Sequence, residues 1–171
     1  MTIKINSFTS VPDRPALGLF LKDYYTNVLP KLAEAGGPAV GAKDLMIGLW
    51  DDIDDYLPPK GALVLAHDAD KLVGCGFLKG LSPTAGELKR LSVSPEYRGQ
   101  GLGKSLITAR IGAARKLGIT DLYADTVRGN RPMLSLYESL GFQYTDRYPG
   151  NANPAEWSKW LVYLHLNLSG T

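Results

Sequence analysis

The chain has 171 residues, of which 44% are hydrophobic and 21% are charged, a mixture typical of one globular domain and not of a disordered chain. A formal net charge of only +2 argues against a protein that coats nucleic acid. With one cysteine and two histidines, the chain can form no internal disulfide and is not expected to hold a Cys- or His-rich metal site. No apolar run reaches 18 residues, and the N-terminus lacks the pattern of a signal peptide. We therefore expect a cytoplasmic protein that neither spans a membrane nor binds a metal.

Hydrophobic periodicity predicts strands and helices in alternation. Apolar runs and alternating patterns predict strands at residues 3–8, 62–67, 72–78, 87–93, 121–127, from 142 and at 160–168. Apolar residues at helical spacing predict helices at residues 17–32, about 42–57, 101–117 and 131–140. Gly74 and Gly76 indicate a bend or a close backbone approach within one strand. This order predicts a single mixed α/β domain over residues 1–171.

Charge is unevenly distributed along the chain. Residues 85–116 carry seven basic and two acidic residues, which makes this segment +5 and the rest of the chain −3. Five aspartates lie between positions 44 and 55. The first segment suits a polyanion and the second suits a cation, although ordinary solvated surface charge would give the same pattern.

The most informative segment is the glycine-rich turn between the strand at 87–93 and the helix at 101–117. At such a turn the first backbone N–H groups of the helix lack partners, and together with the helix dipole they form an anion site suited to phosphate. A Walker A loop would need glycine at position 98, which is Arg98, and the third glycine of a dinucleotide fingerprint is misplaced. The pattern R/Q-x-x-G-x-G/A is matched in full by Arg98, Gly101 and Gly103.

With this pattern the sequence resembles the GCN5-related N-acetyltransferase (GNAT) family, whose loop of this type wraps the pyrophosphate of acetyl-CoA. Asn130, Met133, Tyr137, Gly141 and Phe142 match the family signature N-x-x-A-x-x-x-Y-x-x-x-G-F, with methionine in place of the usual alanine. The match covers roughly residues 60–145. It implies a GNAT-like, mixed and mostly antiparallel sheet flanked by helices in a single domain.

The resemblance also implies acetyl-CoA as co-substrate, and residues 87–93 look like those of small bacterial acetyltransferases of undefined substrate. Residues 61–145 would form the acetyl-CoA-binding core. Residues 1–60 would hold the first strand and the acceptor-side helices, and residues 146–171 the C-terminal strand region. The residues expected to bind acetyl-CoA are Leu91, Ser92, Val93, Arg98, Gly99, Gln100, Gly101, Leu102, Gly103, Lys104, Ser105, Asn130 and Met133.

Two residues are candidates for proton transfer. The family resemblance makes Tyr137 the expected acid for the departing thiolate, and a free tyrosine, with a pKa of about 10, is protonated near neutrality. Glu87 lies eleven residues before Arg98, where the histone acetyltransferase branch has its general base, and this makes it the expected base for the amine. An ion pair of Glu87 with Lys89 or Arg90 is the alternative interpretation.

The acceptor pocket is expected from the early helices and the late strands, as in the family. Aromatic rings beside carboxylates suit an amine through cation–π contact and charge pairing, although the same residues can also cap the core. The expected acceptor-binding residues are Tyr24, Trp50, Asp54, Asp55, Arg90 and Trp157.

The sequence is compatible with several alternatives. A catalytically silent acyl-CoA-binding regulator would keep the glycine loop for binding alone, whereas Tyr137 and Glu87 together favour an enzyme. Cys75 has no evident histidine partner and is expected to be inert. The acceptor can be a small amine, an amino acid, or a lysine or N-terminus of a peptide or protein. Acetyl-CoA and this amine are the expected partners, without nucleic acid or membrane, for either a monomer or a homodimer.

Overall fold

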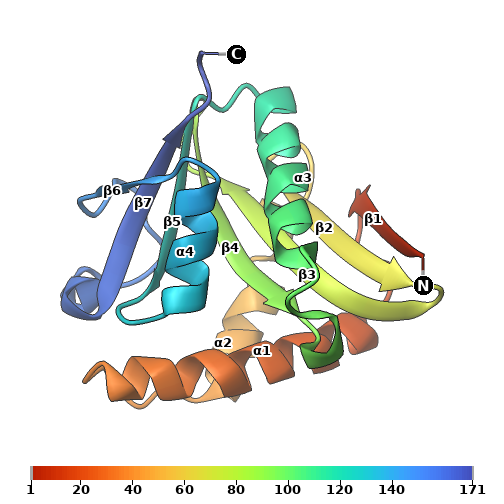
Figure 1. The fold of residues 1–171 in the computed structure, drawn as a ribbon, viewed down its shortest axis with the longest axis horizontal. Helices are drawn as coiled ribbons and strands as arrows, with labels where there is room; N and C mark the ends of the chain where they lie inside the picture. Colours follow the sequence, from red (N-terminus) through yellow and green to blue (C-terminus); the bar gives the residue numbers. More distant parts are fainter. Residues whose placement is uncertain (1, 171) are drawn as a thin grey trace.

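One mixed sheet of seven strands forms the centre of the protein, whose residues 2–170 are described by a computed structural model (Figure 1). The strands lie in the order β1-β2-β3-β4-β5-β7-β6, and all neighbours are antiparallel except β4 and β5. They are β1 (Ile3–Phe8), β2 (Gly61–Asp68), β3 (Lys71–Gly80), β4 (Ala85–Val93), β5 (Asp121–Val127), β6 (Gln143–Thr145) and β7 (Leu161–Asn167). The predicted single-domain fold with a mostly antiparallel sheet is confirmed.

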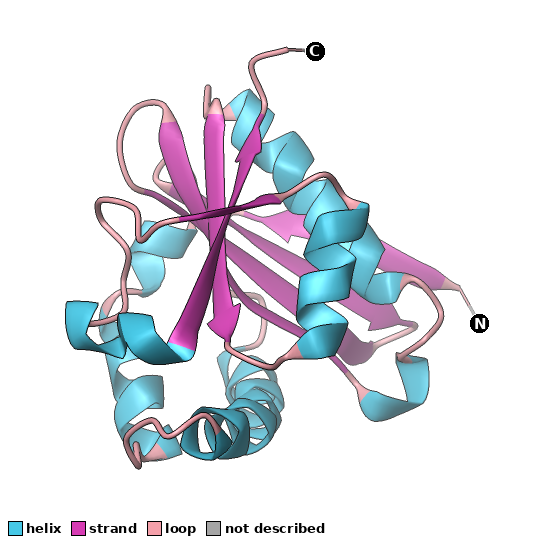
Figure 2. Ribbon diagram, turned by 60° about the vertical axis from the view of Figure 1, so that its left-hand side comes forward, coloured by secondary structure: helices cyan, strands magenta, loops and turns pink. Residues whose placement is uncertain are grey.

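Helices cover both faces of this sheet, with α1 and α2 on one face and α3 and α4 on the other (Figures 1 and 2). They are α1 (Arg14–Glu34), α2 (Ala42–Asp51), α3 (Leu102–Lys116) and α4 (Arg131–Ser139), with 3₁₀ turns η1 (Ile53–Tyr56), η2 (Pro95–Tyr97) and η3 (Ala155–Trp160). The helix predicted at 42–57 ends early, at Asp51, and continues as η1. Carboxylates at its C-terminal end oppose the helix dipole, which explains the early end.

Apolar residues of the central strands divide between two layers of core. Leu88 of β4 packs with Ile107 of α3 and Leu134 of α4. On the opposite face, Phe77 of β3 packs with Leu21 of α1 and other residues of α1 and α2. Because side chains alternate along a strand, the neighbours of Leu88 in β4 face the side of α1, where the cleft described below opens.

A β-bulge interrupts β4 opposite Gly76, where the register with β3 shifts and Arg90 adopts a positive φ of 51°. Arg110 of α3 is fully buried beneath this point and donates hydrogen bonds from Nη1 to the carbonyls of Phe77 and Lys89, at 3.1 and 3.3 Å. A Cβ at Gly76 would lie 2.5 Å from Arg110 Nε. The close approach predicted for this glycine is therefore found, and it makes room for a buried guanidinium that satisfies the carbonyls at the bulge.

The parallel strands β4 and β5 pair only over their first halves. Their register runs from Ala85 with Asp121 to Leu88 with Ala124, and the strands separate beyond these residues. The separation leaves a gap between the second halves of β4 and β5, with α1 across one side and α4 across the other (Figure 1).

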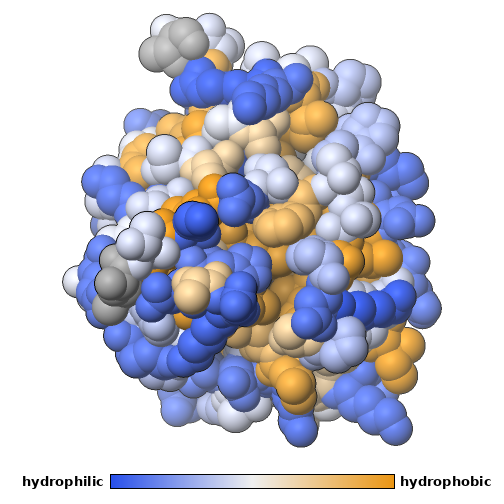
Figure 3. Space-filling view, turned by 90° about the vertical axis from the view of Figure 1, so that its right-hand side faces the viewer, coloured by the Kyte–Doolittle hydropathy of each residue, from blue (hydrophilic) through white to orange (hydrophobic). Residues whose placement is uncertain are grey.

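Among residues 2–170, the exposed large apolar side chains are Leu19, Ile47 and Tyr144. Figure 3 shows apolar patches among polar side chains on the face that includes the edge strand β1. Among residues 2–170, each helix is too short or too polar to cross a membrane.

Candidate active site

A cleft with two connected parts opens where β4 and β5 separate. The outer part, here called the groove, has a volume of about 560 Å³ and lies between α1, the end of β4 and the starts of α3 and α4. The inner part, here called the inner cavity, has a volume of about 160 Å³ and extends between β4 and β5 toward η3. The two parts share the wall residues Tyr24, Val28, Leu91, Asn130 and Met133. A ligand in the groove can therefore reach into the inner cavity.

The glycine-rich turn forms the outer end of the groove. Gly99 and Gly101 have φ values of 73° and 84°, a conformation that favours glycine, and an added Cβ would meet no atom within 4 Å at either position. The turn is therefore open on its outer side. Gly101 caps α3, and no side chain bonds to the first N–H groups of this helix. Arg98 Nε donates to the carbonyl of Val93 at 2.9 Å and ties the turn to the end of β4.

Nearly all of the residues expected to bind acetyl-CoA line the groove. The exceptions are Gln100, which donates to the carbonyl of Glu96 at 3.0 Å, and Ser105, which donates to the carbonyl of Gly101 at 3.2 Å. Their side chains stabilise the turn rather than face the groove. The lining residues are Leu91, Ser92, Val93, Arg98, Gly99, Gly101, Leu102, Gly103, Lys104, Asn130 and Met133.

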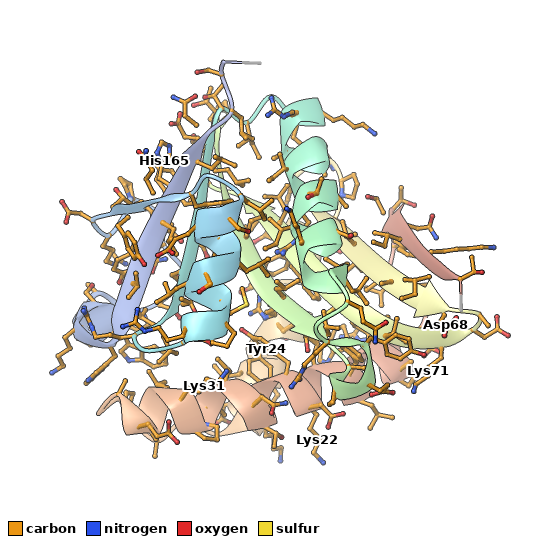
Figure 4. All side chains as sticks on the ribbon, viewed as in Figure 1. Lys22, Tyr24, Lys31, Asp68, Lys71 and His165 are labelled. Atoms are coloured by element: carbon orange, nitrogen blue, oxygen red, sulfur yellow. The ribbon has the colours of Figure 1, made fainter. Side chains whose placement is uncertain are left out.

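Helix α1 supplies the opposite wall of the groove. Figure 4 shows Tyr24 and Lys31 on the side of α1 that faces the sheet, whereas Lys22 points away. Lys31 Nζ donates to Asn130 Oδ1 at 3.3 Å, and Asn130 Nδ2 donates to Thr126 Oγ1 at 3.0 Å. This chain of contacts links α1 to β5 and α4 across the cleft. Sequence reasoning missed Lys31, although it lies seven residues after Tyr24 and so on the same helix face.

The hairpin of β2 and β3 contacts the segment that leads into the turn. Tyr97 Oη donates to Asp68 Oδ2 at 2.9 Å, and Lys71 forms an ion pair with Glu96. The hydrogen bond to Asp68 raises the pKa of Tyr97, so its hydroxyl stays a donor. Figure 4 shows Asp68 and Lys71 at this end of the molecule. These contacts attach the start of the open turn to the β2–β3 hairpin.

Tyr137 lies deep in the cleft. It is 3% exposed and lines the inner cavity one helical turn beyond Met133, which borders both parts. Burial raises the pKa of Tyr137, and the charge of Arg110 opposes that shift. Its hydroxyl has no hydrogen-bond partner within residues 2–170. Tyr137 is thus a protonated donor free to bond to a ligand in the inner cavity.

A group of charged side chains crosses the inner cavity from β4 to β5. Lys89 Nζ lies 3.0 Å from Glu87 Oε1 and 3.4 Å from Asp125 Oδ2. Lys89 and Asp125 line the inner cavity, whereas Glu87 is fully buried behind Lys89. Burial acts to lower the pKa of Lys89, but the charges of Asp125 and Glu87 outweigh it and hold that pKa above its usual value. Lys89 is therefore a cation held between two carboxylates.

Two asparagines from the segment between β6 and η3 complete this group. Asn151 Nδ2 donates to Asp125 Oδ2 at 2.7 Å, and Asn153 Nδ2 donates to the same oxygen at 2.9 Å. Asn151 Nδ2 also lies 3.4 Å from Glu87 Oε2. These contacts fix the side chain of Asp125 in one orientation.

Comparison with known proteins now identifies the family. The model of the acetyltransferase (GNAT) family matches residues 31–142, which include the glycine-rich turn, β4, β5 and Tyr137. The chain belongs to the GNAT acetyltransferase family. It is 35% identical over 116 residues to an uncharacterized N-acetyltransferase of Schizosaccharomyces pombe, covering 67% of this chain and 68% of the relative.

Other known proteins are similar over different lengths. The chain is 36% identical over 112 residues to N-acetyltransferase family 8 member 2 of Rattus norvegicus, covering 63% of this chain and half of the relative. The PaiA N-acetyltransferase of Thermoplasma acidophilum, solved in complex with coenzyme A, has the same fold with a TM-score of 0.71 and 18% identity. That comparison covers 98% of this chain and 99% of the other.

In this GNAT member the predicted acceptor residues fall into two groups. Tyr24, Arg90 and Trp157 line the inner cavity. Arg90 donates from Nε to Tyr25 Oη and from Nη1 to Tyr56 Oη, both at 2.9 Å, so much of its guanidinium is engaged by the protein.

Trp50, Asp54 and Asp55 lie outside the cleft lining. Trp50 stacks under Arg14 near the start of α1, with the guanidinium carbon 4.4 Å from the ring centroid. Asp55 pairs with Lys60 at 3.1 Å and with Lys79 at 3.4 Å. The acidic segment of η1 contacts β3 through Asp55 and Lys79 and does not line the gap between β4 and β5.

Sequence reasoning missed Asp125 and its asparagine partners. A charged residue inside the predicted strand at 121–127 was a usable signal, because parallel pairing places Lys89 and Asp125 on one face. Asn151 and Asn153 gave no such signal, since they stand in an irregular segment. Cys75 is buried, and burial raises the pKa of its thiol to about 12, so it is not a ready nucleophile.

Proposed function

We propose that the protein is an N-acetyltransferase that transfers the acetyl group of acetyl-CoA to a primary amine of a small molecule, amino acid or peptide. The observation that carries this proposal is the connection between the groove and the inner cavity, with Tyr137 just inside the junction. Acetyl-CoA in the groove and an amine in the inner cavity would meet there, so no covalent enzyme intermediate is needed.

The groove suits a long ligand with phosphates at one end. The open turn at residues 99–103 and the uncapped start of α3 fit a pyrophosphate, with the nearby cations Arg98 and Lys104. Leu91 and Met133 give apolar walls for the pantetheine arm, and Asn130 offers an amide beside it. Coenzyme A in the related PaiA structure supports the same ligand class for this chain.

The transfer needs an acid that protonates the departing thiolate and an acceptor for the protons that the amine loses. The amine nitrogen forms a bond to the thioester carbon, and the carbon–sulfur bond then breaks. The acceptor ammonium loses two protons overall, of which one ends on the coenzyme A sulfur and one in solvent. Tyr137 donates its hydroxyl proton to the departing thiolate and is then reprotonated, and its free hydroxyl supports this role.

Glu87 is a poorer fit to the part of a base that meets the amine. It is fully buried, lies 3.0 Å from Lys89 and does not line the inner cavity. These contacts favour the ion-pair interpretation of Glu87 that the sequence left open.

A thiol-release assay with acetyl-CoA and a panel of amines, amino acids and blocked peptides tests the proposed function. We expect thiol release that depends on the amine, with the acetylated amine detected by mass spectrometry. Tight binding of acetyl-CoA in calorimetry without transfer to any of these acceptors would instead favour a catalytically silent acyl-CoA-binding regulator.

A further inference from the structure

The carboxylate of Asp125 has one occupied and one unoccupied oxygen. Lys89, Asn151 and Asn153 all donate to Oδ2, at 3.4, 2.7 and 2.9 Å. Oδ1 has no hydrogen-bond partner within residues 2–170. It is also not one of the fully buried polar atoms that lack a partner in these residues, so it is accessible. Because Asp125 lines the inner cavity, this oxygen is available to a ligand there.

The charges around this oxygen favour a cation. Glu87, Lys89 and Asp125 together carry one net negative charge, and the single ammonium of Lys89 is already shared by the two carboxylates. Arg90 is the other cation on the wall, and its guanidinium is turned to Tyr25 and Tyr56 and lies over the rings of Tyr56 and Phe77. A ligand ammonium at Asp125 Oδ1 would complete the charge balance of the group.

The rest of the inner cavity is mostly apolar. Its walls include Val28, Leu29, Leu32, Leu45, Trp157 and Leu161 from α1, α2, η3 and β7. The volume of about 160 Å³ is close to that of engineered apolar cavities that hold one benzene molecule. The space beside Asp125 therefore fits an apolar group of about that size.

From these observations we propose that Asp125 Oδ1 binds the primary ammonium of the acceptor, and that the buried end of this acceptor is an apolar group no larger than about a benzene ring. The proposal deepens the proposed function and rests on it. It makes Asp125, held by the two asparagines, the residue that selects an alkylammonium or arylalkylammonium group. Such a group can belong to a free amine or to a lysine side chain.

The decisive variant is Asp125→Asn, because it keeps the shape and the oxygen that accepts from the asparagines but turns an NH₂ group toward the ammonium. Asp121→Asn is the matched control, since Asp121 stands on the same strand and pairs with His165 outside the cleft. With phenethylamine as acceptor we expect KM to rise about 10- to 100-fold in Asp125→Asn, as for loss of a hydrogen bond to a charged group. The dissociation constant of acetyl-CoA should change less than twofold, which also shows that the variant is folded.

Asn153→Ala is a second variant that leaves the carboxylate in place and removes one of its three donors. We expect a rise of a few-fold in KM for phenethylamine. Butylamine and a peptide with one free lysine and a blocked N-terminus, tested beside phenethylamine, distinguish a free amine from a lysine side chain.

Direct binding separates this proposal from the proposed function. Calorimetry with phenethylamine is done on the complex of each variant with coenzyme A. Loss of binding in Asp125→Asn supports the amine site, even if the parent releases no thiol and the proposed transfer is therefore wrong. Equal binding or an equal KM in the parent and in Asp125→Asn, or no binding of any of the three amines to the parent complex, would overturn the amine site.

Discussion

The two parts of the cleft are built in different ways. The outer end of the groove is formed by one continuous segment, residues 98–104, and consists mainly of open backbone and a helix start. The inner cavity takes its side chains from α1, α2, β4, β5, α4, η3 and β7 and acts through the charges of Lys89 and Asp125. A local backbone motif is visible in a sequence, whereas a site assembled from distant side chains depends on the tertiary structure. The same division separates the part proposed to bind acetyl-CoA from the part proposed to select the acceptor.

Removal of one hydroxyl should have the largest effect on turnover. Tyr137→Phe deletes the proposed acid and leaves the ring in the core, so kcat should fall about 10²- to 10⁴-fold where chemistry is rate-limiting. Tyr163→Phe is the matched control, since this buried tyrosine bonds to Ser158 outside the cleft. Calorimetry should show unchanged acetyl-CoA binding in both variants. An unchanged kcat in Tyr137→Phe, with chemistry shown to limit the rate, would remove Tyr137 from the mechanism.

The groove can be broken without touching the inner cavity. Gly101→Asp places a side chain at a φ of 84° and a negative charge at the phosphate end, so we expect acetyl-CoA to bind about 10- to 100-fold more weakly in calorimetry. Gly112→Asp is the matched control, because it makes the same change in the interior of α3, where an added Cβ meets nothing within 4 Å. Equal affinity for acetyl-CoA in Gly101→Asp and the parent would refute the role of the turn. In the parent, binding should also weaken as salt is added.

A substitution of Glu87 tests whether this carboxylate is a structural ion-pair partner or the general base. Glu87→Gln removes a buried partner of Lys89, so the free energy of unfolding should fall by about 1–3 kcal/mol in urea titrations. Glu156→Gln, at an exposed position of η3, should change it by less than about 0.5 kcal/mol. The ion-pair interpretation predicts that kcat falls much less in Glu87→Gln than in Tyr137→Phe. A fall in kcat as large as that of Tyr137→Phe, strongest at low pH, would restore Glu87 as the base.

The smallest expected effect concerns the pH profile at the alkaline end. Burial raises the pKa of Tyr137, so its hydroxyl should ionise at a higher pH than that of a free tyrosine, whose pKa is about 10. Turnover should therefore rise with pH as the acceptor ammonium loses its proton, without a decline below pH 10. A fall in turnover well below pH 10, with the protein still folded by circular dichroism, would contradict the proposed state of Tyr137.

Sequence patterns predicted the element order and the sheet class, and most of the residues that they assigned to acetyl-CoA binding line the groove. These residues stand out in the sequence because the turn and the helix start form one continuous segment and Asn130 and Met133 belong to one short signature. Sequence patterns predicted the acidic contact of the acceptor at Asp54 and Asp55, which do not line the cleft, and Asp55 pairs with Lys60 and Lys79. The acidic residue of the inner cavity comes instead from β5. A charge inside the predicted strand marked Asp125 in the sequence, but its place beside Lys89 follows from the long-range parallel pairing of β4 with β5.

The claim that both parts of the cleft hold their substrates at the same time can be tested by initial rates. Thiol release is measured while acetyl-CoA and an accepted amine are varied together. Direct attack in a ternary complex predicts double-reciprocal lines that intersect, with acetylated amine formed in step with free coenzyme A. Parallel lines, together with an acetylated enzyme formed in the absence of amine, would contradict the account.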